Sequence, residues 1–415
     1  MRILHIINHV QNIGNGIVNV AVDLACLQSQ DGHTVAVVSD GGEYETLLAS
    51  HNVRHWQLNQ SREPLNILKA TWYYRQIVQQ FQPDIVHAHM MTGVVLARMF
   101  KSRYKYSLVS TVHNEFQHSA VLMGLADQVI AVSHAVANSM VRRGLAQNKL
   151  RVISNGTLNS PRHRSIQDYQ PLPLQRPAIT TVAGMYTRKG IAELITAFVT
   201  IAPEFPNAHL YLVGDGPDRA MFKTMAQDTL FSDRIHFEGF QPEPQRYMLA
   251  TDIFVLASHC ESFGLVLTEA REAGCAIIAS DVDGIPETLD HRQSGILVPP
   301  QDSQALATTL TQLLKNSVEL HRWKSRAQEN LQRFTAARVN EETLTLYDEL
   351  VTKYNVSKVV ARKEVSKNLF AFNTIFHPTP QAELPWTHKS VNSRLCHKTP
   401  PLAPPRKRGG EPDLQ

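Results

Sequence analysis

The sequence of 415 residues predicts an α/β fold with two doubly wound parallel sheets, each covered by helices. Short apolar runs alternate with amphipathic, helix-like segments up to about residue 350. This alternation stops at one proline-rich segment near the middle of the chain and then starts again, which indicates two domains. Most strand-like runs are apolar throughout, as is typical of strands buried on both faces of a parallel sheet.

The first half of the chain is predicted to form an N-terminal domain over residues 1–156. Helical spacing of apolar residues is found at 17–30, 64–81 and 133–144, between the strand-like runs. Crossovers of this kind between parallel strands are right-handed. The expected strands are Arg2–Ile7, Val35–Ser39, Asp84–His89, Leu108–His113, Gln128–Ser133 and Arg151–Asn155.

A second domain is predicted over residues 178–335, after a linker at 157–177 that contains four prolines. Helices are expected at 302–316 and 318–332, and a helix at 336–352 is expected to pack back towards the N-terminal domain. The expected strands are Ile179–Ala183, His209–Val213, Ile235–Gly239, Ile253–Ala257, Ala276–Ser280 and Gly295–Val298.

Residues 353–415 differ in composition, with 8 prolines and 11 Lys and Arg against 4 Asp and Glu, and we predict a disordered basic tail. Residues 1–352 contain 30 Lys and Arg against 33 Asp and Glu. Because nucleic-acid binding needs a clustered basic surface, we expect no nucleic-acid partner. Contact between the tail and anionic lipid at the inner face of the cell membrane is a separate hypothesis.

The compartment is predicted from the cysteines and from the longest apolar runs. The cysteines have no paired spacing and suit a reducing environment: Cys26, Cys260, Cys275 and Cys396. No run approaches the length of a membrane-spanning helix, and the first apolar run is too short for a signal-peptide core. We therefore expect a cytoplasmic protein.

The segment from Glu261 to Glu269 lies between a predicted strand and a predicted helix, where open parallel sheets bind their ligands. Gly264 and Leu265 would present free backbone N–H groups at the helix N-terminus, which favours a diphosphate. The two carboxylates can accept hydrogen bonds from sugar and ribose hydroxyls. One helix end is thus predicted to bind sugar, diphosphate and ribose.

This segment and the motifs that follow it resemble the retaining glycosyltransferases of family 4, which have the GT-B fold of two Rossmann-like domains facing a cleft. The further motifs are Gly274, Ser280-Asp281, Gly284-Ile285-Pro286-Glu287 and Gly295-Ile296-Leu297-Val298-Pro299. The resemblance covers roughly residues 1–350. It implies transfer of a hexose-type sugar from a nucleotide diphosphate sugar to a glycan or lipid-linked saccharide, with retention, in polysaccharide or lipopolysaccharide synthesis. It also implies no metal and no cofactor beyond the donor substrate.

The resemblance assigns Lys189, in the segment Ala183–Gly190, to the donor diphosphate. Where the family usually has an Arg, this chain has Met185 and a shorter loop, so Arg188 is the candidate replacement. Leu212–Pro217 matches a turn beside the family's donor cleft, and we expect its role to be mainly structural. Ser133 matches a position that is more often a helix cap than a ligand contact.

Two more site residues follow from the resemblance in the N-terminal half. Gly16 takes the place of a family glycine near the donor phosphate, whereas Asn15 replaces a glycine and Val18 stands where many members have Glu. His113 matches a His that faces the donor sugar. The predicted catalytic residues are therefore His113, Lys189 and Glu261, and the predicted donor-binding residues are Gly16, Arg188, Lys189, Glu261, Gly264, Leu265 and Glu269.

His87 and His89 point to one face of a strand, which also suits a metal site. The sequence places no third ligand nearby, and we expect no metal. Two alternatives to a transferase stay open. A nucleotide-sugar 2-epimerase shares the architecture, and the departures at Asn15, Val18 and Met185 suit a non-catalytic sugar-nucleotide-binding scaffold.

Overall fold

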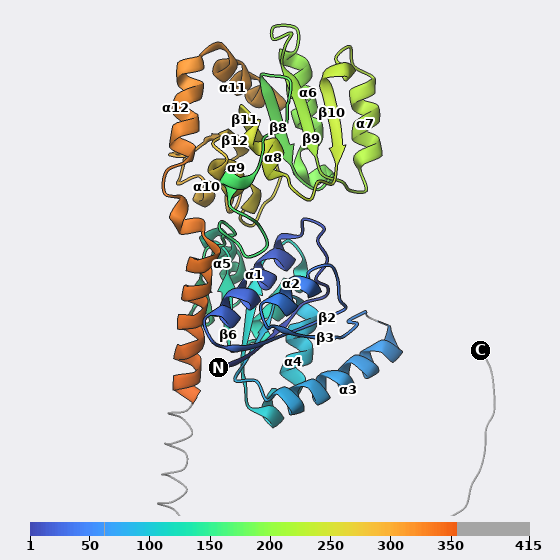
Figure 1. Ribbon diagram of the computed structural model, residues 1–415, viewed down its shortest axis with the longest axis vertical. Helices are drawn as coiled ribbons and strands as arrows, with labels where there is room; N and C mark the ends of the chain where they lie inside the picture. The colour runs from blue at the N-terminus through green and yellow to red at the C-terminus, as the bar shows by residue number, and fades with distance from the viewer. Residues whose placement is uncertain (62, 355–415) are drawn as a thin grey trace, which may run out of the picture. The chain divides into compact units, whose positions relative to one another are not determined.

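The computed structural model describes residues 1–61 and 63–354, and it contains two parallel sheets with helices on both faces (Figure 1). The first sheet has seven strands in the order β3-β2-β1-β4-β5-β6-β7, and the second has six in the order β10-β9-β8-β11-β12-β13. The described ladders between these strands are parallel. The predicted α/β class with two doubly wound sheets is confirmed.

The first sheet is built from residues 2–152. Its strands are β1 (Arg2–Ile6), β2 (Thr34–Ser39), β3 (Arg54–Gln57), β4 (Ile85–Ala88), β5 (Ser107–Val112), β6 (Gln128–Ala131) and β7 (Leu150–Val152). Its helices are α1 (Gly16–Gln30), α2 (Glu45–Ser50), α3 (Pro64–Phe81), α4 (Met91–Tyr104) and α5 (His134–Arg142), with 3-10 turns η1 (His118–Leu125) and η2 (Gln147–Lys149).

The second sheet is built from residues 178–298 and is followed by two helices. Its strands are β8 (Ala178–Val182), β9 (His209–Val213), β10 (Ile235–Gly239), β11 (Ile253–Leu256), β12 (Ala276–Ser280) and β13 (Ile296–Val298). The helices are α6 (Ile191–Ile201), α7 (Arg219–Gln227), α8 (Gln245–Leu249), α9 (Leu265–Glu272), α10 (Ile285–Thr288), α11 (Ser303–Lys315) and α12 (Ser317–Ala327). Short 3-10 turns lie at η3 (Ile166–Asp168), η4 (Thr187–Lys189), η5 (Ser232–Arg234) and η6 (Leu331–Phe334).

Two elements differ from the sequence predictions. Strand β3 was not predicted, because Arg54–Gln57 is a partly exposed edge strand with no apolar run to mark it. The expected helix over 318–332 ends at Ala327, and a 3-10 turn follows after Asn330, whose φ of 57° breaks the helical path. An L-residue with positive φ cannot continue a right-handed helix.

The first sheet buries two different sets of side chains, one on each face. Because side chains alternate along a strand, Leu4 and Ile6 of β1 pack in one apolar cluster with α3 and α4. Ile3 of the same strand packs in another cluster with α1 and with the helix at 336–354. His5 therefore points to the second face, towards α1.

The helix at 336–354 lies along the first sheet domain (Figure 1). Asn340 donates a hydrogen bond to Asp31 at 2.6 Å, and Tyr347 reaches the buried side chain of His87. The predicted tail, residues 353–415, lies outside the described residues except for 353 and 354, which belong to this helix. None of the helices in the described part of the chain is both long and apolar enough to cross a bilayer.

The chain passes between the two sheet domains at residues 156–158 and again at 334–336, and these two segments run side by side. The Leu158 N–H donates to the Phe334 carbonyl at 3.0 Å, and the Ala336 N–H donates to the Leu158 carbonyl at 2.9 Å. Gly156 permits this approach, because a Cβ atom there would overlap the Phe334 carbonyl. All described residues belong to one compact unit.

Candidate functional site

Most of the predicted site residues lie where the strand order of each sheet reverses, and His113 follows the next strand, β5. In the second sheet this reversal falls between β8 and β11, and in the first between β1 and β4. At such a point neighbouring loops leave the sheet in opposite directions and open a crevice beyond the carboxyl ends of the strands. Lys189 follows β8 and Glu261 follows β11, whereas Gly16 follows β1 and His89 follows β4.

Lys189 and Glu261 form an ion pair, in which Lys189 Nζ donates to Glu261 Oε2. Their side chains are 15% and 17% exposed, so the pair can exchange partners with a ligand. The two loops are held together by the backbone, since the His259 N–H donates to the Arg188 carbonyl at 2.8 Å. The structure therefore brings together two of the three predicted catalytic residues.

Gly190 fixes the position of the loop that carries Lys189. It has a φ of 67°, which glycine adopts without the cost that a Cβ atom adds. A Cβ atom at this position would also overlap the Ala257 carbonyl at the end of β11. The close approach of the loop to β11 thus depends on glycine.

Helix α9 begins at the other predicted binding residues. Gly264 precedes it with a φ of 87°, and none of the described side chains caps this helix end. The amides of its first turn therefore lack the side-chain partner that most helix N-termini have. Leu265 reaches across to the N-terminal half, because a Cβ atom on Gly16 would lie 3.1 Å from Leu265 Cδ1.

The basic segment departs from the family pattern for a reason visible in its packing. Met185 is fully buried in the apolar core of the second sheet, and its N–H donates to the Asp215 carbonyl at 2.9 Å. A side chain held there cannot reach a donor in the cleft. Arg188 is exposed, and its guanidinium lies over the Tyr186 ring at 5.6 Å.

The turn Leu212–Pro217 has the structural role that we predicted from its glycines. Gly214 has a φ of 133°, and a Cβ atom there would overlap the Ala183 carbonyl. A Cβ atom on Gly216 would lie 2.7 Å from the Met185 backbone nitrogen. The two glycines therefore let this turn pack against the basic segment.

Asn15 and Val18, the departures in the N-terminal half, also have structural roles. Asn15 caps α1, because its Oδ1 accepts a hydrogen bond from the Ile17 N–H at 3.0 Å. Such a cap typically contributes about 1 kcal/mol to stability. Val18 is buried in the core between α1 and the sheet.

Glu269 lies on α9 beside the linker. Its Oε1 is 3.5 Å from Thr157 Oγ1, and burial raises its pKa to about 7, against the opposing charge of Arg162. Arg162 is itself engaged in a buried ion pair with Asp23 at 2.8 Å. The contacts of Glu269 are thus with the linker, whereas Glu261 pairs with Lys189.

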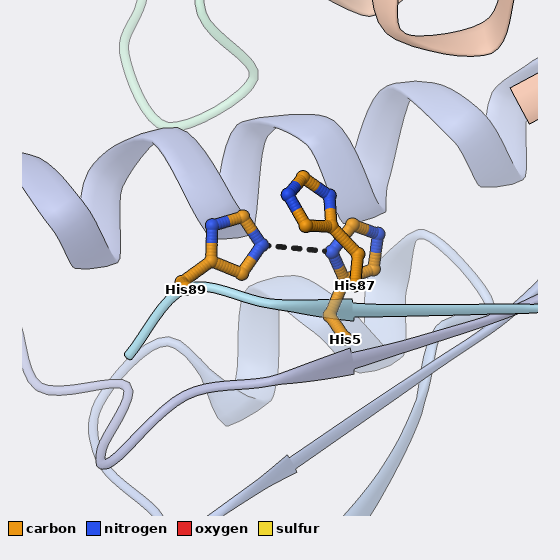
Figure 2. Close-up of side chains that lie close together, drawn as sticks. All are labelled: His5, His87 and His89. Atoms are coloured by element: carbon orange, nitrogen blue, oxygen red, sulfur yellow. Dashed lines mark hydrogen bonds between the residues drawn. The ribbon is translucent and has the colours of Figure 1, made fainter. Parts of the chain in front are cut away.

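His113, which follows β5, lies at the end of a row of imidazoles. Its Nε2 is 3.2 Å from His89 Nδ1. His89 Nε2 is in turn 3.0 Å from His5 Nδ1, which is the hydrogen bond drawn in Figure 2. Burial lowers the pKa of His113 to about 3 and that of His5 to about 4. All of these rings are therefore neutral at pH 7.

The expectation that no third nitrogen lies near His87 and His89 is wrong. His5 of β1 pairs in register with His87 of β4, and one ring nitrogen from each of the three residues lies within 4.8 Å of the others (Figure 2). Residues 82 positions apart meet only through sheet pairing, which spacing in the sequence cannot show. The available signal was a polar residue inside the otherwise apolar run of β1.

A polar seam joins the two sheet domains near the site. Ser133 caps α5 by accepting from the Val136 N–H, as we predicted, and it also donates to the Ser262 carbonyl at 2.8 Å. Ser262 Oγ donates to Glu115 at 2.7 Å, and burial raises the pKa of Glu115. Glu115 is not among the predicted site residues, although a carboxylate two residues after His113 was a usable signal.

Glu287 of α10 completes this seam. Its two carboxylate oxygens accept hydrogen bonds from the His134 and Ala135 N–H groups at 2.8 Å each. The first turn of α5 is thereby satisfied by a carboxylate, which the helix dipole favours. Beside the seam lies a cavity of about 350 Å³, lined by Glu115, Phe116, Ala135, Asn138, Ser139, Arg142, Arg143 and Asp283.

Comparison with solved structures defines the class of fold. Anabaena HepE, solved with UDP and glucose, superposes with a TM-score of 0.72 at 21% identity, over 84% of this chain and 99% of that one. WaaG, a glycosyltransferase involved in lipopolysaccharide biosynthesis, gives a TM-score of 0.68 at 14% identity, over 83% of this chain and 99% of that one. The two sheets thus form a GT-B fold.

Sequence comparison identifies the family. The model of glycosyl transferases group 1 matches residues 164–330, and that of glycosyltransferase family 4 matches residues 14–157. The lipopolysaccharide core biosynthesis glycosyltransferase LpsD of Rhizobium meliloti is 28% identical over 68% of this chain and 80% of its own length. The N-acetyl-alpha-D-glucosaminyl L-malate synthase of Bacillus anthracis is 25% identical over 80% of this chain and 93% of its own. The chain belongs to the group 1, family 4 glycosyltransferases, and it is a glycosyltransferase.

Proposed function

We propose that this glycosyltransferase moves a hexose-type sugar, with retention and without a metal, from a nucleotide diphosphate sugar to a glycan or lipid-linked saccharide. The observation that supports the proposal best is the Lys189–Glu261 pair beside the uncapped start of α9. LpsD and WaaG are both described as glycosyltransferases of lipopolysaccharide biosynthesis, which favours a role for this chain in lipopolysaccharide or other cell-surface polysaccharide synthesis.

Lys189 and Glu261 suit a donor because each can exchange its partner. A diphosphate carries the negative charge that Glu261 now offers to Lys189, and the helix that begins four residues after Glu261, α9, has no side-chain cap among the described residues. When the diphosphate takes over Lys189, the Glu261 carboxylate becomes free to accept hydrogen bonds from sugar hydroxyls. The pair thus holds both groups in place until a donor binds.

In the proposed reaction the bond between the anomeric carbon and the diphosphate oxygen breaks, and the acceptor oxygen bonds to that carbon on the same face. The acceptor proton passes to an oxygen of the departing diphosphate. The Lys189 ammonium and the α9 amides stabilise the charge that develops there, which is the main contribution of such sites to rate. We assign no side chain as a covalent nucleophile.

The first experiment is a thermal-shift series with UDP-, GDP- and ADP-sugars on the full chain. UDP-glucose is tested first, because HepE has been solved with it. A ligand that binds only the folded state raises the melting temperature. We expect one nucleotide class to do so, with a smaller effect in Glu269→Ala and Lys189→Ala and the full effect in Lys315→Ala, which removes an exposed ion pair.

The donor identified in this way is then incubated with candidate saccharide acceptors, and proton NMR reads the anomeric configuration of the product. Retention of the donor configuration supports the proposed reaction. Inversion would contradict it. A rearranged sugar formed without any acceptor would point to the epimerase instead.

A further inference from the structure

The imidazole row in the first sheet has a defined hydrogen-bond direction. The row consists of His5 in β1, His89 just after β4 and His113 just after β5, and His87 of β4 lies beside it. Burial keeps the pKa values of all four rings well below neutrality. A neutral imidazole has one N–H and one lone pair. Each ring between two partners must therefore donate through one nitrogen and accept through the other.

The direction is fixed at Gln28 of α1. Gln28 Oε1 lies 2.8 Å from His5 Nε2, and because a carbonyl oxygen only accepts, His5 donates from Nε2. His5 Nδ1 then accepts from His89 Nε2, and His89 Nδ1 accepts from His113 Nε2. His113 Nδ1 is left as a lone pair, and this buried atom has no hydrogen-bond partner among the described residues.

The Gln28 amide nitrogen takes no part in the row, because Nε2 is buried and has no hydrogen-bond partner within residues 1–61 and 63–354. The link from Gln28 to the row is therefore the single contact of its Oε1 with His5 Nε2.

His87 belongs to a separate branch. The Tyr347 hydroxyl lies 2.6 Å from His87 Nδ1, and Thr111 Oγ1 lies 2.7 Å from His87 Nε2. Both nitrogens of His87 are thus engaged by hydroxyl groups. The three histidines drawn in Figure 2 have metal-like spacing, but hydrogen bonds account for both nitrogens of His5 and both nitrogens of His87.

We infer that Gln28, His5 and His89 are positioning residues that hold His113 in the tautomer protonated at Nε2, so that Nδ1 accepts a hydrogen bond from a donor-sugar hydroxyl. The inference rests on the proposed function for the identity of that ligand. The row itself is a property of the free protein. Discrimination of the sugar would then depend on Gln28, although three histidines, His5, His89 and His113, separate it from the substrate.

The tautomer is measured directly by NMR of the full chain labelled with ¹⁵N-histidine, without substrate. We expect the His113 signals of a ring protonated at Nε2, assigned by their loss in His113→Asn. Gln28→Met removes the acceptor at the start of the row, and we expect a mixture of His113 tautomers. Gln28→Glu keeps an acceptor oxygen and should retain the wild-type tautomer. Thr111→Val, which breaks only the His87 branch, should leave His113 unchanged.

Kinetics supply the second readout. Loss of one neutral hydrogen bond predicts a rise of about three- to tenfold in the KM for the sugar donor in Gln28→Met. The Kd for the nucleoside diphosphate alone should stay at the wild-type value, because the proposed contact is with the sugar. Gln28→Glu should restore most of the lost affinity.

Three results would overturn the inference. The first is a wild-type His113 protonated at Nδ1, and the second is an unchanged donor KM in a folded Gln28→Met. The third is stoichiometric zinc whose removal by a chelator shifts the same histidine signals. Failure of the proposed function shows differently, as a wild-type protein that binds no nucleotide sugar while its His113 tautomer is still measurable.

Discussion

The two sheets present different chemistry at corresponding edges. In the second sheet the loops after β8 and β11 carry a pair of opposite charges, Lys189 and Glu261. In the first sheet the strand ends carry buried, neutral imidazoles that end at His113. One edge is therefore organised by charge and the other by the direction of hydrogen bonds. We expect substitutions in the first case to change affinity for phosphate, and in the second to change recognition of the sugar.

The largest effect should come from breaking the charged edge. Lys189→Ala removes the cation proposed to stabilise the leaving diphosphate, and kcat should fall about 100- to 1,000-fold, as steady-state transfer assays will show. Lys189→Ala combined with Glu261→Gln controls for the unpaired carboxylate, and Lys315→Ala controls for loss of a surface charge. A kcat near the wild-type value in the single variant would remove Lys189 from the mechanism.

The second prediction tests how the charged edge is held in place. Gly190→Ala adds a Cβ atom that overlaps the Ala257 carbonyl at a residue with positive φ, so the Lys189 loop must move away from β11. We expect a loss of about 2–4 kcal/mol in the free energy of unfolding in urea. Gly144→Ala also has positive φ but open space around it, and should cost less. Equal losses of unfolding free energy in the two variants would show that the positive φ alone, and not the overlap with Ala257, determines the cost.

The third prediction uses pH to distinguish the contribution of Glu269, in the second sheet domain, from that of the imidazole edge. Glu269 has a pKa of about 7, whereas His113 and His5 have values of about 3 and 4, so near neutrality the carboxylate titrates and these imidazoles do not. If the ionised carboxylate binds the ribose, the Kd for the donor nucleotide should fall by up to about tenfold from pH 6 to pH 8. Glu269→Gln should show a flat profile in isothermal titration. A wild-type slope that survives in Glu269→Gln would assign it to another group.

The free energy of unfolding should depend on the Glu269 carboxylate in the opposite direction, and should fall as the pH rises. Because the folded state raises the pKa of Glu269 from 4.5 to about 7, its contribution is fully present below pH 4.5 and is lost as pH rises through about 7. This loss amounts to up to about 3 kcal/mol. The difference between wild type and Glu269→Gln in urea unfolding at several pH values measures it.

The smallest effect is expected at the seam between the domains. Glu287→Ala leaves the His134 and Ala135 amides without their carboxylate, and we expect a loss of about 1–2 kcal/mol in the free energy of unfolding. Glu342→Ala, which removes an exposed pair with Arg338, should stay within about 0.5 kcal/mol. A seam variant as stable as this control would show that water replaces the carboxylate at no cost.

The sequence predicted the sheets well where burial leaves a pattern. Strands such as β1 and β12 are apolar runs, and each was found close to its observed bounds. Strand β3 lacks that pattern because it is an edge strand. The resemblance to family 4 placed Lys189 and Glu261 at one predicted donor site, but the ion pair between them was not predicted.

The imidazole row could not be predicted in the same way. His5 and His87 meet because β1 and β4 are neighbours in the sheet, and strand order is a property of the whole fold. Gln28 comes from a helix on the same face. The seam residue Glu115 likewise depends on a contact with Ser262, 147 positions away.

The two adjacent chain crossings, at 156–158 and 334–336, have a mechanical consequence. Because they are hydrogen-bonded to each other, we expect them to bend together, as one hinge rather than as two independent tethers. The linker contacts first one sheet domain and then the other within a few residues, since Arg162 pairs with Asp23 of α1 and Arg164 pairs with Glu243, which precedes α8. A swing about this hinge would have to break the seam, in which Ser262, next to Glu261, donates to Glu115, two residues after His113. The Lys189–Glu261 pair and the imidazole row each lie within one sheet domain, so neither has to break when the seam does.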